Sequence, residues 1–163
     1  MYNRIFIILT ATLMFGVQQS NIRAVYKMMY GIITEGENNV MFWFGVVSMV
    51  ALPMIGIFDE SRWGTLHGIS AGIFFIGFLI YGTLLAKHLY ANKEKFPAEE
   101  QAAIATIHTS VNTMFYITIS FFISLLLFGS KGLTAILEWA TVLYFVNFFS
   151  IASFTNPFYD SVH

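Results

Sequence analysis

The chain has 163 residues, of which 57% are hydrophobic and only 10% are charged. A soluble globular domain carries about one quarter charged residues, so this composition indicates apolar surroundings such as a bilayer. The net charge is −1, and no basic stripe is present to neutralise phosphates, which argues against nucleic-acid binding. The lack of cysteine in the sequence excludes disulfides, thiolate metal sites and cysteine nucleophiles.

Five segments are long and apolar enough to cross a bilayer, which takes about 20 mostly apolar residues. In chain order they are residues 5–30, 40–58, 66–86, 104–128 and 132–155. In the first segment only Ile5–Val17 is strongly apolar, so we expect its polar second half to face other helices or to emerge into the interface. Pro53 predicts a kink in the second segment. The pattern predicts an all-α, polytopic transmembrane helical bundle of about five spans, forming a single domain over residues 1–163.

The connecting segments are polar. Gly31–Asn39 is predicted to be a loop, Asp59–Thr65 a tight charged turn, and Lys87–Ala103 the longest link. In that link, Pro97 is followed by two glutamates, which predicts that the fourth helix begins near Pro97.

The distribution of basic residues predicts the orientation. Five spans place the basic residues on two sides, with five on the side of the C-terminus and three on the other. The five are Arg23, Lys27, Lys87, Lys93 and Lys95, and the three are Arg4, Arg62 and Lys131. This bias favours a cytoplasmic (or matrix-like) C-terminus.

Three ionisable residues are predicted at one membrane face. Glu138 lies about 9 Å along the fifth helix, His67 opens the third, and Asp59 ends the second. Ionisable groups in spanning helices are costly, which makes each a candidate functional residue. A histidine–carboxylate pair here could relay protons or hold a ligand; the alternative is an interhelical hydrogen bond that only fixes packing.

A second polar patch, His108 with Asn112, is predicted at the opposite face. The two residues are four apart and share one side of a helix, and we expect the patch to face the bundle. His67 and His108 are on the order of 20–30 Å apart by helix rise, so they cannot ligate one haem. No metal-ligand cluster, phosphate loop or nucleophile–base spacing occurs in the sequence, so we expect no cofactor, no metal and no self-contained enzyme.

Glycines recur every four residues at the start of the third segment. Gly64, Gly68 and Gly72 form one stripe, and small residues on one stripe let helix backbones approach closely. The stripe predicts a tight helix contact within the bundle, or alternatively a dimer face.

Several short motifs together resemble the DRAM/Frag/Sfk family, which includes damage-regulated autophagy modulators and relatives involved in GPI-anchor maturation. The motifs are Gly56-Ile57-Phe58-Asp59, Leu66-His67-Gly68, Ala71-Gly72-x-Phe74-Phe75, Glu138-Trp139 and the later Asn147, with Arg23 after the first helix. The resemblance implies that Asp59, His67, Glu138 and Trp139 correspond to motif residues of the family and are candidate site residues here. It also implies that the C-terminus lies in the cytosol. Family members usually have six spans, so this chain is expected to correspond to the last five, with a groove that another protein could fill.

Three functions stay open at this stage. The first is a non-enzymatic membrane protein of DRAM/Frag/Sfk type that acts through lipids or partner proteins in an endomembrane or the cell membrane. The second is a structural accessory subunit of a large assembly, such as a respiratory or ATP-synthase complex of the mitochondrial inner membrane. The third is a lipid-remodelling enzyme that uses His67 with Glu138 or Asp59 as acid–base partners.

Overall fold

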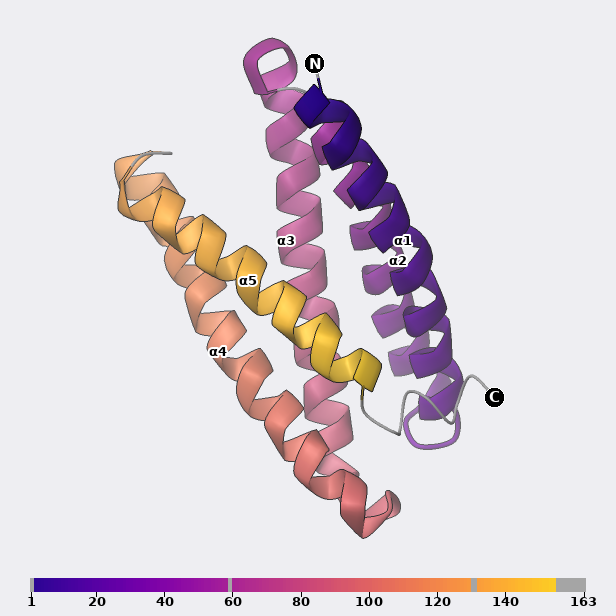
Figure 1. The fold of residues 1–163 in the computed structure, drawn as a ribbon. Helices are drawn as coiled ribbons and strands as arrows, with labels where there is room; N and C mark the ends of the chain where they lie inside the picture. Colours follow the sequence, from indigo (N-terminus) through magenta and orange to yellow (C-terminus); the bar gives the residue numbers. More distant parts are fainter. Residues whose placement is uncertain (1, 59, 130–131, 155–163) are drawn as a thin grey trace. The chain divides into compact units, whose positions relative to one another are not determined.

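A computed structural model describes residues 2–58, 60–129 and 132–154 of the chain. The described residues form five α-helices and a one-turn 3-10 helix, η1 (Figure 1). The helices are α1 (Tyr2–Met29), α2 (Glu35–Ile57), α3 (Glu60–Ala91), α4 (Ala98–Phe128) and α5 (Leu133–Phe154), with η1 (Lys93–Lys95) between α3 and α4. The predicted all-α fold class is confirmed, and each predicted span coincides with one helix.

Two helix starts differ from the prediction. Glu35–Asn39 belongs to the first turn of α2 and not to a loop, and Glu60–Thr65 belongs to α3 and not to a turn. The start of α3 is interrupted at Trp63, whose φ and ψ of −129° and 38° are not helical. The predicted start of α4 is confirmed, with Pro97 in the N-cap position.

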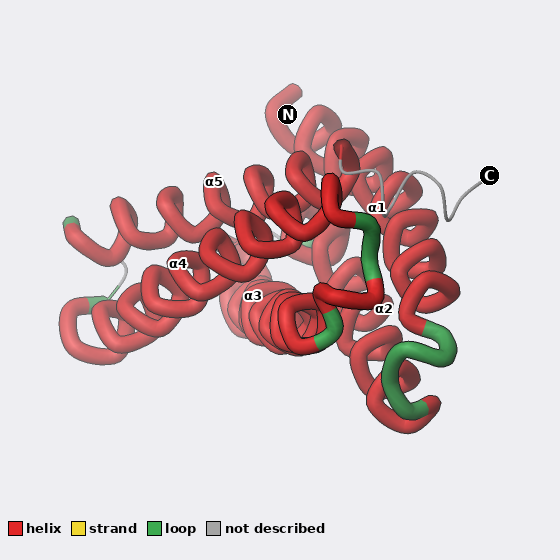
Figure 2. The backbone as a smooth tube through the Cα atoms, turned by 90° about the horizontal axis from the view of Figure 1, so that it is seen from below, coloured by secondary structure: helices red, strands yellow, loops and turns green. Residues whose placement is uncertain are grey.

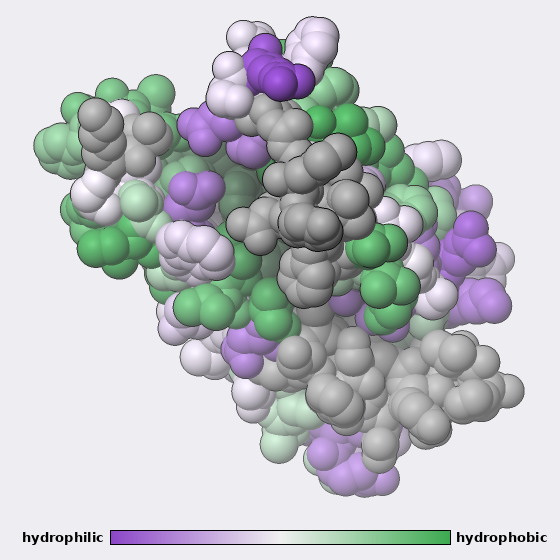
Figure 3. All heavy atoms as spheres, turned by 45° about the horizontal axis from the view of Figure 1, so that its top comes forward, coloured by the Kyte–Doolittle hydropathy of each residue, from purple (hydrophilic) through white to green (hydrophobic). Residues whose placement is uncertain are grey.

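Three of the helices, as far as the described residues extend, are long and apolar enough to cross a membrane: α2, α3 and α4. In α5, the part whose side chains the structure describes is an apolar helix over Leu133–Phe148. The connections between helices are short (Figure 2). On the face drawn in Figure 3, hydrophobic side chains cover large areas of the outer surface, as expected for helices that face lipid.

The chain divides into two compact units, Met1–Tyr81 and Gly82–His163. The boundary falls within α3, so the first unit holds α1, α2 and most of α3. The second holds the end of α3, η1, α4 and α5.

In the first unit, α1 packs along α2. The buried side of α1 carries Gln18, Ile22, Val25 and Met29, a spacing of three or four residues that keeps them on one face. The second half of α1 therefore packs through apolar side chains and Gln18, whereas its polar residues Ser20 and Arg23 are exposed. Near the connection, the Asn38 side chain donates to the Tyr26 carbonyl at 2.8 Å, which ties the start of α2 to the end of α1.

The tight approach of α3 to α2 occurs at Gly77. A Cβ at Gly77 would overlap the hydroxyl of Ser48 and lie 3.5 Å from the carbonyl oxygen of Phe44. At Gly64, Gly68 and Gly72, by contrast, a Cβ would meet no described atom within 4 Å. The close helix contact is therefore further along α3 than predicted. The alternative, that the glycine stripe forms a dimer face, stays a prediction.

The first turn of α2 is held by a capping box. The Thr34 hydroxyl accepts from the Glu37 backbone N–H at 3.3 Å, and the Glu37 carboxylate accepts from the Thr34 backbone N–H at 3.2 Å. We expect Thr34→Ala to lower the stability of the folded chain by about 1 kcal/mol. Thermal unfolding in detergent measures this change. Thr34→Ser keeps the hydroxyl and serves as the control, and equal losses in both variants would contradict the cap.

Candidate functional site

In the second unit, α4 and α5 are antiparallel neighbours joined by a short turn. Gly129 ends α4 with a φ of 70°, a backbone conformation that favours glycine. Just inside the turn, the hydroxyls of Ser124 and Thr134 share a buried hydrogen bond of 2.6 Å. At the other end of the pair, the Asn147 amide donates to the Ser110 hydroxyl at 3.3 Å. Two polar contacts therefore fix the register of α5 on α4.

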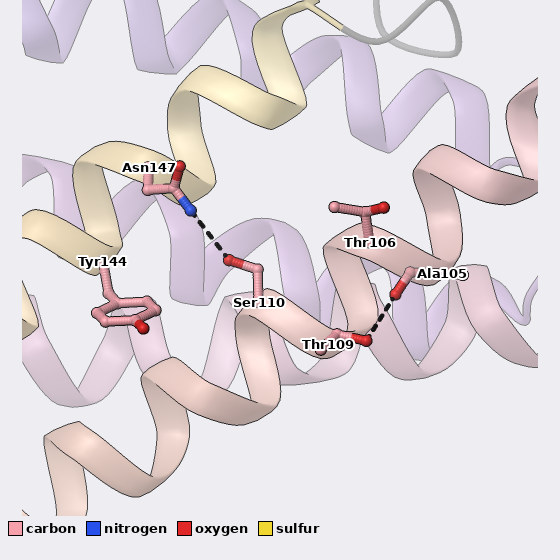
Figure 4. A pocket seen from close by; sticks show the side chains of 6 residues that line it. All are labelled: Ala105, Thr106, Thr109, Ser110, Tyr144 and Asn147. Atoms are coloured by element: carbon pink, nitrogen blue, oxygen red, sulfur yellow. Dashed lines mark hydrogen bonds between the residues drawn. The ribbon is translucent and has the colours of Figure 1, made fainter.

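An open groove of about 470 Å³ lies on this helix pair, beside the Asn147–Ser110 contact, with polar groups set in a mostly apolar surface. Its lining combines hydroxyl, amide and phenol groups with one alanine, drawn in Figure 4. The lining residues are Ala105, Thr106, Thr109, Ser110, Tyr144 and Asn147. We call this feature the α4–α5 groove. None of its lining residues is acidic, basic or a histidine.

The groove can both accept and donate hydrogen bonds. The hydroxyls of Thr106 and Thr109 each donate to a backbone carbonyl of their own helix at 3.0 Å, which leaves oxygen lone pairs free to accept. Asn147 directs one amide hydrogen at Ser110, and its side chain is exposed. The second amide hydrogen of Asn147 and the phenol of Tyr144 can donate to a bound group.

The groove lies about the thickness of a hydrocarbon core away from the end of α4. Ser110 is 18 residues before the end of α4, which corresponds to about 27 Å of helix, close to the thickness of the hydrocarbon core. If the end of α4 marks one edge, the groove lies at the other, on the side of η1.

The predicted polar patch lies close by in sequence but on another side of α4. The His108 ring stacks on Tyr90 of α3 with centroids 4.3 Å apart, and the Lys93 ammonium lies 4.9 Å from the same Tyr90 ring. Asn112 lies 3.4 Å from His108, which fits two residues that share one side of the helix. His108 is half-buried and Asn112 is exposed, so only the histidine packs against a second helix as expected.

In the first unit, His67 binds the end of α2. Its Nδ1 lies 2.8 Å from the Phe58 carbonyl oxygen and 3.2 Å from that of Ile55. The last carbonyls of a helix have no partner within it, so a donor there satisfies them. With Nδ1 as the donor, His67 caps α2. This geometry favours the packing alternative over a catalytic one for His67.

The other predicted site residues do not join His67 within its unit. Asp59 lies outside the described residues. Glu138 and Trp139 belong to α5 of the second unit, and both side chains are exposed. A meeting of His67 with Glu138 therefore stays a prediction. In the described ranges, no group of three His, Asp or Glu residues could hold a metal ion.

Sequence reasoning did not predict the α4–α5 groove. Ser110 and Asn147 are 37 residues apart, and nothing in the spacing shows that they meet. The available signal was Asn147 itself, a single amide in the apolar run of the last helix. An amide in such a run requires a hydrogen-bonding partner.

Long apolar helices, apolar outer surfaces and polar groups placed near the helix ends define a multi-pass α-helical integral membrane protein. The chain belongs to the family described as Frag1/DRAM/Sfk1/Cwh43P N-terminal domain, whose model matches residues 3–159. The predicted resemblance is therefore confirmed over almost the whole chain. No curated protein and no solved structure matches this chain.

Proposed function

We propose that this protein acts without catalysis, by holding a membrane lipid or a partner protein within the bilayer. The observation that carries the proposal is the α4–α5 groove, which can orient a bound group through hydrogen bonds. Its lining consists of hydroxyl, amide and phenol groups with one alanine, and it contains no histidine, carboxylate or amine. Such a lining supports binding more readily than general acid–base chemistry.

A structural subunit of a larger membrane assembly is the second candidate. It is favoured by Asn112, an exposed amide side chain on a helix apolar enough to span the membrane. Lipid tails cannot satisfy an amide, whereas a neighbouring helix can. By its family, the free-standing protein is proposed for an endomembrane or the cell membrane. The accessory candidate would place it in the mitochondrial inner membrane.

One extraction experiment tests both candidates. The full chain is released from its native membrane in mild detergent, separated on a native gel and analysed by mass spectrometry for lipids and proteins. We expect a small species that retains lipid, with retention reduced in an Asn147→Leu variant. A stable large complex would favour the accessory subunit. Turnover of an acyl lipid by the purified protein, lost in His67→Ala, would overturn the non-enzymatic proposal.

A further inference from the structure

The α4–α5 groove also indicates what kind of lipid it holds. We infer that it binds the hydroxyl end of an uncharged lipid, with the apolar body of that lipid lying along α4. The inference rests on the proposed function and narrows it to one ligand chemistry. Four observations support this inference. They are the absence of charge in the lining, its hydrogen-bonding pattern, the position of the groove along α4, and the exposed apolar side chains next to it.

The lining offers no charge to match a charged headgroup. None of its six residues is basic or acidic. The ammonium of Lys93, at the same end of α4, lies over the Tyr90 ring. A phosphate placed in the groove would lose hydration without gaining a cationic partner, which is unfavourable.

The hydrogen-bonding pattern fits a group that both donates and accepts. The Thr106 and Thr109 oxygens have already used their protons on backbone carbonyls, so toward the groove they can only accept. Tyr144 and Asn147 supply donors from the facing helix. A hydroxyl placed between the two helices would satisfy one partner on each side, whereas an ester or ether oxygen would leave the threonine oxygens without a donor.

The position of the groove along α4 and the exposed side chains next to it fit the apolar body of such a lipid. Tyr116, Ile123 and Leu127 follow Thr109 at intervals of seven, seven and four residues, which keeps them on one side of α4. All three are exposed. They extend from the groove toward the opposite membrane edge, the direction in which the apolar body of a lipid lies when its hydroxyl is at the interface.

Two classes of lipid share this chemistry, the sterols and the diacylglycerols, and photolabelling separates them. The full chain is reconstituted in phosphatidylcholine nanodiscs with a diazirine sterol, a diazirine diacylglycerol or a diazirine phosphatidylserine. We expect saturable labelling of α4 or α5 peptides by at least one neutral probe and not by the anionic one. Labelling by the sterol alone or by the diacylglycerol alone identifies the class.

Matched variants assign the labelling to the groove. Thr109→Val with Asn147→Leu removes hydrogen bonds while keeping side-chain size, and we expect labelling to fall by about tenfold. Thr65→Val with Asn39→Leu makes the same chemical change on residues of the first unit that do not line the groove, and we expect no change. Size-exclusion profiles check that both double variants are folded.

Three results overturn the inference. They are equal labelling by phosphatidylserine, a loss of labelling no larger in the groove variant than in its control, and no saturable labelling by either neutral probe. An anionic lipid that co-purifies with the chain and is lost in the groove variant would overturn this inference alone. Absence of any retained lipid, together with labelling that the groove variant does not change, would remove the proposed lipid function as well.

Discussion

A Gly77→Ala variant is expected to lose about 1–3 kcal/mol of stability, because the added methyl group would occupy space that the Ser48 hydroxyl already fills. Ser48 is completely buried and donates a hydrogen bond to the Phe44 carbonyl within α2. Rotating the hydroxyl away from the methyl group breaks that bond, and moving the helices apart opens a void, so either response costs free energy. Thermal unfolding of the full chain in detergent measures the loss.

Two further variants make this test specific. Gly68→Ala adds the same methyl group where no described atom lies within 4 Å, so we expect its stability to be unchanged or slightly higher. Ser48→Ala combined with Gly77→Ala removes the overlapping oxygen and should recover part of the loss, a coupling of about 0.5–3 kcal/mol between the two positions. A Gly68→Ala variant less stable than Gly77→Ala would show that the glycine stripe, and not Gly77, is the close contact.

The helices were predictable from the sequence because a bilayer-spanning segment must be long and apolar, whatever it packs against. Their starts were less predictable. The glutamates and asparagines at residues 35–39 have loop-like composition, yet the Thr34-to-Glu37 spacing is that of a capping box, a signal that composition alone hides. At the start of α3, the sequence predicts a turn over Asp59–Thr65, whereas Glu60–Thr65 belongs to the helix and only Trp63 has non-helical φ and ψ.

The close contacts and the groove were not predictable in the same way. Spacing places Gly64, Gly68 and Gly72 on one stripe, but it does not say whether that stripe faces a helix or lipid. The tight position at Gly77 depends on Ser48, a residue of another helix at the same level in the first unit. The α4–α5 groove depends likewise on the level at which Asn147 meets Ser110. The periodicity of a sequence does not show which residues of two neighbouring helices lie at the same height, because that depends on turn geometry and packing.

His67 allows a capping role to be separated from a catalytic one. Removing the ring in His67→Ala leaves the carbonyls of Ile55 and Phe58 without their donor, and we expect a loss of about 1–3 kcal/mol. His67→Asn places an N–H donor at the same distance from the backbone as Nδ1, but it cannot titrate. The asparagine variant should therefore recover most of the stability in the same detergent unfolding experiment.

The two readouts, stability and activity, give opposite patterns for the two roles. If His67 only caps α2, stability and lipid retention change together: both fall in the alanine variant and both recover in the asparagine variant. If His67 is an acid–base group, asparagine restores stability but not activity, because an amide neither takes up nor releases a proton near neutral pH. An asparagine variant as unstable as the alanine variant would contradict the cap itself. The capping geometry predicts the first pattern, in which the histidine positions the α2–α3 connection and the binding chemistry lies in the other unit, between α4 and α5.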